Sequence, residues 1–212
     1  MKKIFIGAKI KNEPNYEKIK EIVNKKITEK KIAVCYSNQF IEVAKKISDK
    51  LNKKVVQTIQ ILGCSNPHLS KEVEAILLIG QGKFHSVSIA YESKIPTYIL
   101  ENETIEKISE KEVQKMEQKE KGMYLKYLHS EKIGILVTNK PGQQRLKNAL
   151  RYLKSLKEKK GYIFISNDLN TKEFENFQIN CWINTACPRM DLTDGEIINL
   201  EKLQRLEKLN SR

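Results

Sequence analysis

The sequence predicts an α/β protein with two tandem three-layer, parallel-sheet domains of the Rossmann-like kind. Short apolar runs that suit buried strands alternate along the chain with amphipathic runs that suit helices. This alternation is typical of a parallel sheet covered by helices. The run 75–80 is apolar without a break, as expected for a strand with both faces buried. After a long charged segment the strand–loop–helix order begins again near Ile133, which predicts the second domain.

The first predicted domain comprises residues 29–128 and includes a connecting helix. Strands are expected at 31–36, 54–62, 75–80 and 97–100. Helices are expected at 40–51 and 86–93, with a short helix opening at 70–73. The charged connector 102–128 is predicted to be helical throughout, with Ile105, Ile108, Val113 and Met116 on its inner side.

The second predicted domain comprises residues 129–212. Strands are expected at 133–138, 162–166 and 177–183, and helices at 143–158, 171–177 and 196–209. Before both domains, the segment 1–28 predicts a strand at 3–8 and an amphipathic helix at 16–29. A lone first strand needs neighbours that the residues after it do not obviously supply.

The bulk composition predicts a soluble globular protein. Hydrophobic residues make up 40% of the 212 residues and charged residues 31%. No apolar run approaches the ~20 residues of a membrane span. The first three residues lead directly into a strand pattern and not into a signal peptide. We therefore expect a cytoplasmic protein.

The net charge of +13 raises the question of nucleic-acid binding. Arginine occurs only five times, so 34 of the 39 basic residues are lysine. The lysines spread along helical stretches and alternate with glutamate, as in the run 17–21. This pattern favours a solvated lysine-rich surface over nucleic-acid binding, and it leaves an acidic macromolecular partner open.

Two of the four cysteines are candidate metal ligands. The cysteines form no Cys-x-x-Cys pair, which argues against a zinc ribbon. Cys64 and Cys187 each follow a predicted strand, and the carboxyl ends of strands are where open α/β sheets bind ligands. Thiolates are the usual ligands of iron–sulfur clusters, but spacing alone also allows buried structural thiols. Cys35 and Cys181 lie inside predicted strands, where a small buried side chain is the better interpretation.

Two further segments suit ligand binding. Gly-Gln-Gly at 80–82 follows a buried strand and would let a ligand approach the backbone closely, although any turn can use glycines. His85, just beyond, suits a ligand, a hydrogen-bond donor or an ordinary surface residue. Pro-Gly-Gln-Gln-Arg at 141–145 offers N–H groups and a guanidinium that suit a carboxylate, or an ordinary turn and helix start.

Four motifs in order resemble those of the archaeal 2-(3-amino-3-carboxypropyl)histidine synthase family of diphthamide synthesis. They are Leu-Gly-Cys at 62–64, Gly-x-Gly-x-Phe-His at 80–85, Gly-Gln-x-Arg at 142–145 and Ala-Cys-Pro-Arg at 186–189. The resemblance covers about residues 30 to 195. Any one of these motifs alone would be weak, but four in the right order are specific.

The resemblance implies transfer of a 3-amino-3-carboxypropyl group from S-adenosylmethionine to a histidine of elongation factor 2. It implies a four-iron four-sulfur cluster held by three cysteines, one from each of three similar domains. Cys64 and Cys187 would be metal ligands in this chain. The S-adenosylmethionine site would be lined by Gly80, Gly82, His85, Gln143, Arg145 and Arg189.

The chain also departs from the family pattern. Gln81 stands where the family has an aspartate, and Ser86 where it often has a proline. The family's first domain, with its cluster cysteine, has no counterpart, and the strand 3–8 resembles the last strand of that domain. We therefore expect a homodimer, or a complex with a separate first-domain polypeptide that supplies the third thiolate.

Three functions remain to be weighed. The resemblance favours the first step of diphthamide synthesis as part of such a complex. A second possibility is a non-catalytic accessory subunit that supports the cluster of a partner. A third is a basic α/β binding module that holds no metal.

Overall fold

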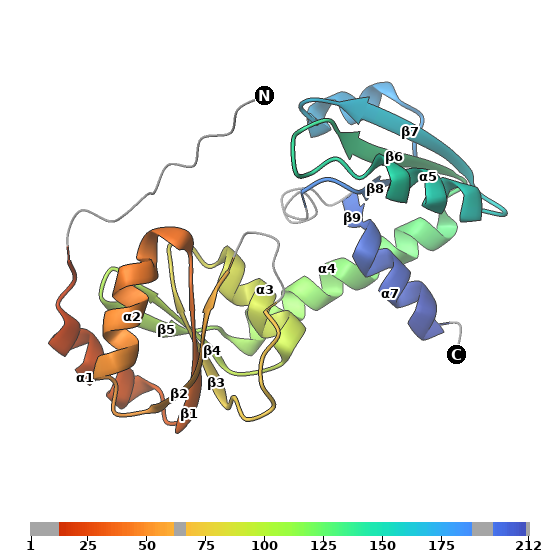
Figure 1. The fold of residues 1–212 in the computed structure, drawn as a ribbon. Coiled ribbons are helices and arrows are strands. Elements are labelled where there is room, and N and C mark those ends of the chain that lie inside the picture. The colour runs from red at the N-terminus through yellow and green to blue at the C-terminus, as the bar shows by residue number, and fades with distance from the viewer. Residues whose placement is uncertain (1–12, 62–66, 188–196, 211–212) are drawn as a thin grey trace. The chain divides into compact units, whose positions relative to one another are not determined.

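The computed structural model of the chain describes residues 13–61, 67–187 and 197–210. The chain divides into two compact units, Met1–Met116 and Glu117–Arg212. Each unit holds one sheet (Figure 1). The predicted fold class is confirmed, because both units are mixed α/β structures with sheets dominated by parallel strands.

The sheet of the first unit has five strands in the order β2-β1-β3-β4-β5. The strands are β1 (Lys31–Tyr36), β2 (Lys54–Gln60), β3 (Ala75–Ile79), β4 (Thr97–Glu101) and β5 (Thr104–Lys107). The pairings among the first four strands are parallel, and β5 alone runs antiparallel to its neighbour. The carboxyl ends of β1, β3 and β4 therefore meet at one edge of the sheet.

Helices cover both faces of this sheet, which gives three layers. They are α1 (Tyr16–Lys26), α2 (Ile41–Lys50), α3 (Phe84–Ser93) and the first part of α4 (Glu110–His129), with a short 3₁₀ helix at Asn38–Phe40. Ile32 and Val34 of β1 point into a core shared with α1 and α2. Cys35 lies in the opposite core, with Ile89 of α3. Figure 1 shows α1 and α2 on one side of the sheet and α3 on the other.

The sequence around α1 explains both ends of this helix. Asn15 caps the start, because its side chain accepts a hydrogen bond from the Lys18 N–H at 3.1 Å. Lys25 and Lys26 lie in the last turn, where positive charge favours the helix dipole. Ile19 and Val23 are buried against the first sheet.

The predicted continuous helix over 102–128 is wrong at its start. Residues 104–107 form β5, which pairs with β4 through a two-residue turn. Asn102 and Glu103 adopt positive φ angles of 47° and 58° in that turn, a geometry usually marked by Asn-Gly. Ile105 is buried as part of a strand, and α4 begins only at Glu110. The short helix expected at 70–73 is a turn closed by the Val73 N–H and the Ser70 carbonyl, 3.1 Å apart.

The sheet of the second unit has four parallel strands in the order β7-β6-β8-β9. The strands are β6 (Lys132–Thr138), β7 (Lys160–Ser166), β8 (Cys181–Asn184) and β9 (Ile197–Asn199). The later part of α4, α5 (Leu146–Ser155) and α7 (Leu200–Asn210) share one core with this sheet. On the other face, Trp182 packs against Phe164 and Phe174.

Several predicted boundaries in this unit shift. The strand expected at 177–183 is β8, and it starts only at Cys181. The helix expected at 171–177 is a 3₁₀ helix, η2 (Thr171–Asn176). The helix expected at 196–209 is preceded by β9, so α7 begins at Leu200. The strand predicted at 3–8 lies outside the described residues.

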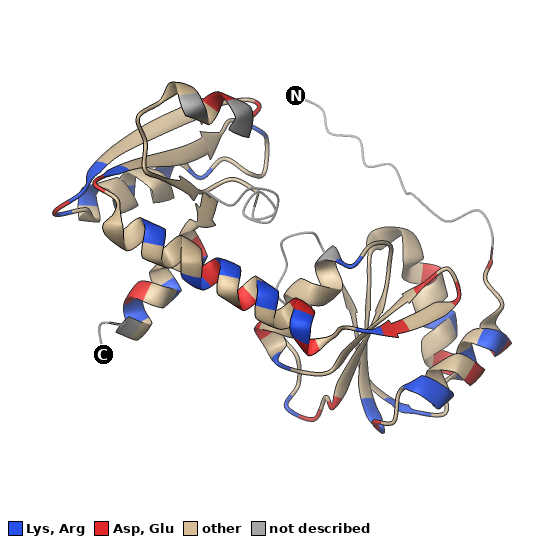
Figure 2. Ribbon diagram, turned by 180° about the vertical axis from the view of Figure 1, so that it is seen from behind, with Lys and Arg blue, Asp and Glu red and all other residues tan. Residues whose placement is uncertain are grey.

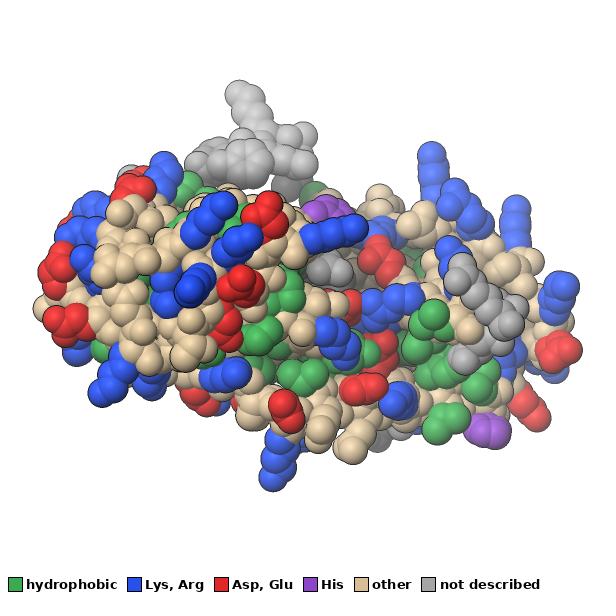
Figure 3. Space-filling view, turned by 90° about the horizontal axis from the view of Figure 1, so that it is seen from below, with side chains coloured by type: hydrophobic (Ala, Val, Ile, Leu, Met, Phe, Trp, Pro, Cys, Tyr) green, Lys and Arg blue, Asp and Glu red, His purple; other side chains and the backbone are tan. Residues whose placement is uncertain are grey.

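The domain limits expected at residues 28 and 128 stay predictions. The boundary between the compact units falls within α4, and the ribbon of this helix carries both basic and acidic residues in Figure 2. In the space-filling view, Lys and Arg side chains are interspersed with Asp and Glu over much of the visible face (Figure 3).

No helix in the described part of the chain has the length and apolar character needed to cross a membrane.

Candidate functional site

Two candidate site segments of the second unit leave the same edge of its sheet. β6 and β8 are adjacent and parallel, and they end at Thr138 and Asn184. The loop 139–145 follows β6, and the residues 185–187 follow β8. Because parallel strands end at one edge, the predicted residues Gln143, Arg145 and Cys187 all belong to segments that start there.

Cys187 lies three residues beyond the end of β8, in the segment 185–187, which is hydrogen-bonded to the sheet. Thr185 donates to the Leu136 carbonyl through both its N–H, at 3.1 Å, and its Oγ1, at 2.7 Å. The Ala186 N–H donates to Asn184 Oδ1 at 2.8 Å. The Cys187 side chain is only partly buried, whereas Thr185 and Ala186 are buried. The loop therefore brings a thiol to the surface from a fixed backbone.

The two strand cysteines differ from Cys187 in burial. Cys35 and Cys181 are both 0% exposed. Burial raises the pKa of the Cys35 thiol to about 12, because the thiolate would lose its hydration. Since metal ligation requires the thiolate, Cys35 is poorly suited to it. Cys64, the other predicted ligand, lies outside the described residues.

The loop between β6 and α5 is a turn and not a helix start. Gly142 adopts a φ of 82°, which favours glycine, and the Gln143 N–H donates to the Lys140 carbonyl at 3.0 Å. The helix expected from 143 begins only at Leu146. Gln143 is exposed to solvent in this turn.

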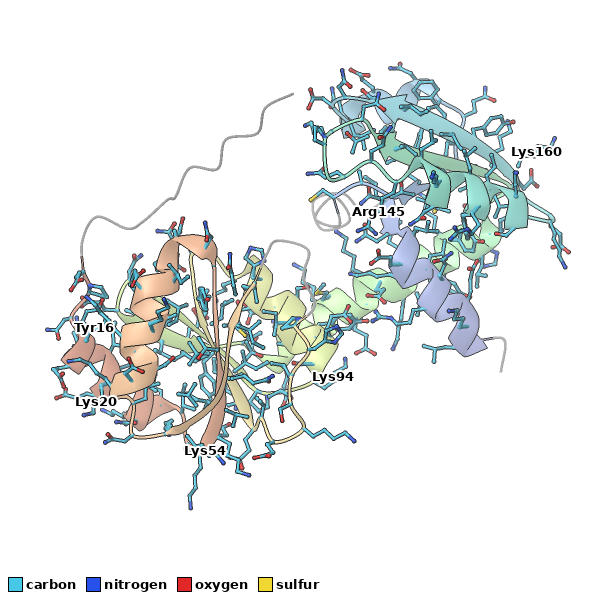
Figure 4. All side chains as sticks on the ribbon, in the orientation of Figure 1. Tyr16, Lys20, Lys54, Lys94, Arg145 and Lys160 are labelled. Atoms are coloured by element: carbon cyan, nitrogen blue, oxygen red, sulfur yellow. The ribbon has the colours of Figure 1, made fainter. Side chains whose placement is uncertain are left out.

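Arg145, at the N-cap of α5, has an acidic partner. Its guanidinium forms an ion pair with Glu201, in the first turn of α7. Figure 4 labels Arg145 where the loop meets the helix. Both side chains are largely exposed, so the pair contributes little to stability and the arginine is available to a competing carboxylate.

In the first unit, Gly80 and Gly82 follow β3 at the edge where β4 also ends. The Gly80 N–H donates to the Leu100 carbonyl at 3.3 Å, which extends the sheet by one bond. Gly82 adopts a φ of 76°, and its N–H donates to Glu101 Oε1 at 3.1 Å. His85 is the second residue of α3 and is half-buried. The structure thus brings these three predicted residues to one edge of the sheet.

Sequence reasoning missed a set of amide side chains at this same edge. Gln39 Nε2 lies 3.5 Å from Gln81 Oε1, and Gln60 Nε2 donates to Asn38 Oδ1 at 3.2 Å. Asn38 and Gln39 open the short 3₁₀ helix that follows β1, and Gln60 ends β2. Their position after the strands was the available signal. Gln81, the departure from the family aspartate, therefore lies beside another neutral amide.

Within each unit the predicted residues fall at a carboxyl edge, but the metal site itself is not assembled in the described ranges. Among those residues, no three His, Cys, Asp or Glu side chains come together to hold a metal ion. Cys64 and Arg189 lie outside the described residues. The assignments to cluster and to S-adenosylmethionine therefore stay predictions.

Comparisons with known proteins point to one family. The family model described as "Putative diphthamide synthesis protein" matches residues 1–197. The chain is 31% identical over 205 residues to 2-(3-amino-3-carboxypropyl)histidine synthase of Methanocaldococcus jannaschii, covering 92% of this chain and 57% of that protein. It is 30% identical over 137 residues to the synthase of Pyrococcus horikoshii, covering 64% of this chain and 40% of that protein.

Solved structures give the same result for the fold. The crystal structure of Dph2 from Pyrococcus horikoshii matches with a TM-score of 0.79 and 25% identity, over 90% of this chain and 61% of that chain. The crystal structure of Dph2 from the same organism with a 4Fe-4S cluster matches with a TM-score of 0.77 and 24% identity, over 91% and 62%. The chain thus spans 40% to 57% of the length of the two archaeal synthases.

Proposed function

Because the chain belongs to the diphthamide synthesis protein family, we propose that it takes part in the first step of diphthamide synthesis. In this step the 3-amino-3-carboxypropyl group of S-adenosylmethionine moves to a ring carbon of a histidine in elongation factor 2. Methylthioadenosine leaves and the ring releases a proton. The names of the archaeal relatives support a transferase of this kind.

The observation that supports this proposal most is the Cys187 thiol, held at the carboxyl edge of the second sheet by a hydrogen-bonded loop. Of the three cysteines in the described ranges, this one alone is only partly buried, which fits a metal ligand better than the enclosed Cys35 and Cys181. We propose that Cys187 and Cys64 bind a four-iron four-sulfur cluster, the kind of cluster that the structural neighbour carries. When bound, the cluster would supply the electron that breaks the carbon–sulfur bond of S-adenosylmethionine and would take one electron back as the substituted ring loses its proton, so the transfer is redox-neutral overall.

We further propose that S-adenosylmethionine contacts Gly80, Gly82, His85, Gln143, Arg145 and Arg189. The glycines offer close approach to backbone, and Gly82 lies in a turn that a side chain would strain. Arg145 suits the amino-acid carboxylate, because a guanidinium binds a carboxylate through two parallel hydrogen bonds. To do so, it would exchange Glu201 for the ligand, an exchange that costs little at an exposed pair.

The resemblance implies three cluster thiolates, and we propose that the one besides Cys64 and Cys187 comes from a second copy or from a separate polypeptide that resembles the family's first domain. We propose such a complex, in a reducing compartment such as the cytoplasm that keeps the thiols free. If the complex has activity only when a partner contributes its own complete cluster, the chain is an accessory subunit. If anaerobically purified chain and complex are both colourless and free of iron, the chain is a metal-free binding module.

The charge distribution supports a protein substrate with an acidic surface. Residues 139–157 hold six basic and no acidic residues. Lys147, Arg151 and Lys154 are exposed on α5, and no carboxylate of the described residues pairs with them. In contrast, lysines of α1 and α2 pair with glutamates, as Lys50 does with Glu17 at 2.6 Å. We propose that this face of α5, named the α5 basic face, contacts elongation factor 2.

Iron binding in cysteine variants tests the proposal. The full chain, alone and with the candidate partner polypeptide, is reconstituted anaerobically with iron and sulfide, and bound iron is measured per chain. Cys187→Ala and Cys64→Ala should each lose most of the iron that the wild-type complex retains.

Cys181→Ala is the matched control. Cys181 lies at the start of β8, the strand that leads to Cys187, and its thiol is fully buried. It should retain wild-type iron. Iron loss from Cys181→Ala or Cys35→Ala equal to that from Cys187→Ala would show that the ligand is assigned to the wrong cysteine.

A further inference from the structure

Asn184 is the last residue of β8 and lies three residues before Cys187. It is 2% exposed, although its side chain is a polar carboxamide. A buried carboxamide must find hydrogen-bond partners, because an unsatisfied amide in the interior is destabilising. The partners that Asn184 finds are all on or beside the loop that presents the thiol.

The carboxamide of Asn184 makes three hydrogen bonds. Its Oδ1 accepts from the Ala186 N–H at 2.8 Å. Its Nδ2 donates to the Cys187 carbonyl at 2.7 Å and to Asn199 Oδ1 at 2.6 Å. An asparagine amide has two N–H donors, so both are used. The bonds also fix the orientation of the amide, because only this orientation places the oxygen on an N–H and the nitrogen on two oxygens.

Asn199 anchors this side chain from the neighbouring strand. It is the last residue of β9 and pairs with Asn184 across the parallel strands. It is also buried, at 6% exposure. The two carboxamides therefore connect the ends of β8 and β9 to the backbone of residue 187, at the edge from which the loop leaves.

We infer that Asn184 is a positioning residue for the Cys187 thiolate, with Asn199 as its anchor. The inference rests on the proposed function, in which Cys187 is a cluster ligand. Thr185 already attaches the start of the loop to β6. The Asn184–Cys187 bond holds the backbone of the residue that carries the sulfur. Residues 185–187 are thereby held before the cluster binds, so little chain entropy is lost on ligation.

The alternative is that Asn184 only caps the strand and stabilises the fold. The Asn184→Asp variant separates these roles, because the carboxylate still accepts from the Ala186 N–H but cannot donate to the Cys187 carbonyl. The Asn184→Asp change also removes the donation to Asn199 Oδ1. Asn199→Ala removes that donation but leaves the bond from Asn184 to the Cys187 carbonyl, and Asn184→Ala removes all three bonds.

The control is Asn180→Ala. Asn180 lies at the opposite end of β8, where its Oδ1 accepts from the Lys132 N–H at 3.0 Å. This change removes a carboxamide from the same sheet without touching the loop. Asn180 is exposed and its side chain makes this one bond, so the change costs less stability than the Asn184 changes do and leaves Cys187 undisturbed.

The first readout is the alkylation rate of Cys187 by iodoacetamide in the full metal-free chain, in a Cys64→Ser background, with the modified peptide identified by mass spectrometry. The rate should rise about fivefold in Asn184→Asp, the factor expected for loss of the one bond to the Cys187 carbonyl, and at least that much in Asn184→Ala, which also loses the bond from Ala186. Asn199→Ala should show a smaller rise, and Asn180→Ala the wild-type rate. Wild-type rates in folded Asn184 and Asn199 variants, or an equal rise in Asn180→Ala, would overturn the inference.

The second readout is the rate of iron release to a chelator from the reconstituted complex, which should increase by a similar factor in Asn184→Asp. Absence of iron from the wild-type complex would refute the proposed function, and the alkylation result would still decide whether Asn184 positions the thiol. Iron release at the wild-type rate together with faster alkylation would overturn the role of Asn184 in cluster binding.

Discussion

At the scale of single residues, burial separates the cysteines and makes one of them sensitive to alkaline pH. The pKa of Cys35 is raised by burial from 9.0 to about 12. Above pH 9 the unfolded thiol loses its proton, while the folded thiol keeps it until about pH 12. The stability that this group contributes is intact below pH 9 and is lost as the pH rises through this window, by at most ~1.4 kcal/mol per pH unit.

Urea denaturation of wild type and Cys35→Ala across the alkaline range measures this effect. The Cys35→Ala protein should lose less stability between pH 9 and pH 11 than the wild type does, although it starts about 1 kcal/mol lower because of lost packing. Parallel curves for wild type and Cys35→Ala would contradict the assignment of Cys35 as an enclosed neutral thiol.

Replacement of two glycines by alanine should have opposite effects on stability. A Cβ on Gly134 would overlap the ring of Trp182 on the neighbouring strand. Gly134→Ala should therefore destabilise the protein by roughly 1–3 kcal/mol, the range for overpacking. Gly122, in the interior of α4, has open space around a new Cβ, so Gly122→Ala should stabilise by up to about 1 kcal/mol. The midpoint of thermal unfolding of both variants measures the contrast, and a stable Gly134→Ala would mean that Trp182 packs elsewhere.

At the scale of elements, one cluster of hydrogen-bonded side chains connects three helices of the second unit. Tyr152 of α5 donates to the Tyr127 hydroxyl of α4 at 2.8 Å, and Tyr127 donates to Glu207 of α7 at 2.8 Å. Burial raises the pKa of both tyrosines, so both stay protonated as donors. Tyr152→Phe should destabilise by about 1–2 kcal/mol in urea denaturation. Tyr162→Phe, at a half-exposed tyrosine, should change stability by less than ~0.5 kcal/mol, and equal effects would contradict this account.

The sequence predicted most strands and helices because their patterns are local. β1, β3 and β6 are continuous apolar runs, and their burial confirms that both faces of each sheet are covered. β5 and β9 were missed for a physical reason. A four-residue and a three-residue strand are too short for any period, and each is stabilised by its neighbour in the sheet and not by its own residues.

The candidate site shows the same division. The thiol, glycines and arginine could be predicted because their types and motifs carry the chemistry. Asn184 and Asn199 could not, since they are 15 residues apart and meet only when β8 and β9 pair. The pairing of Arg145 with Glu201 was also hidden, because it depends on where α7 begins.

At the scale of the whole molecule, the α5 basic face should govern binding of the protein substrate. The triple variant Lys147→Glu/Arg151→Glu/Lys154→Glu should weaken the Kd for elongation factor 2 at least severalfold, and the wild-type Kd should itself rise with salt. A control variant with the same charge change at exposed lysines of the first unit, Lys25→Glu/Lys45→Glu/Lys111→Glu, should bind nearly as the wild type does. Equal weakening by both variants would show that net charge matters and not this face.

The central claim is that this chain, through Cys187, serves in transfer of the 3-amino-3-carboxypropyl group to elongation factor 2. The most direct measurement follows label from S-adenosylmethionine, radiolabelled in that group, into the histidine of elongation factor 2, with the complete anaerobic complex. The account predicts label transfer with wild-type chain and with Cys181→Ala, and loss of at least about 90% of it with Cys187→Ala, as expected when a metal ligand is removed. Undiminished transfer by the Cys187→Ala complex would contradict the claim.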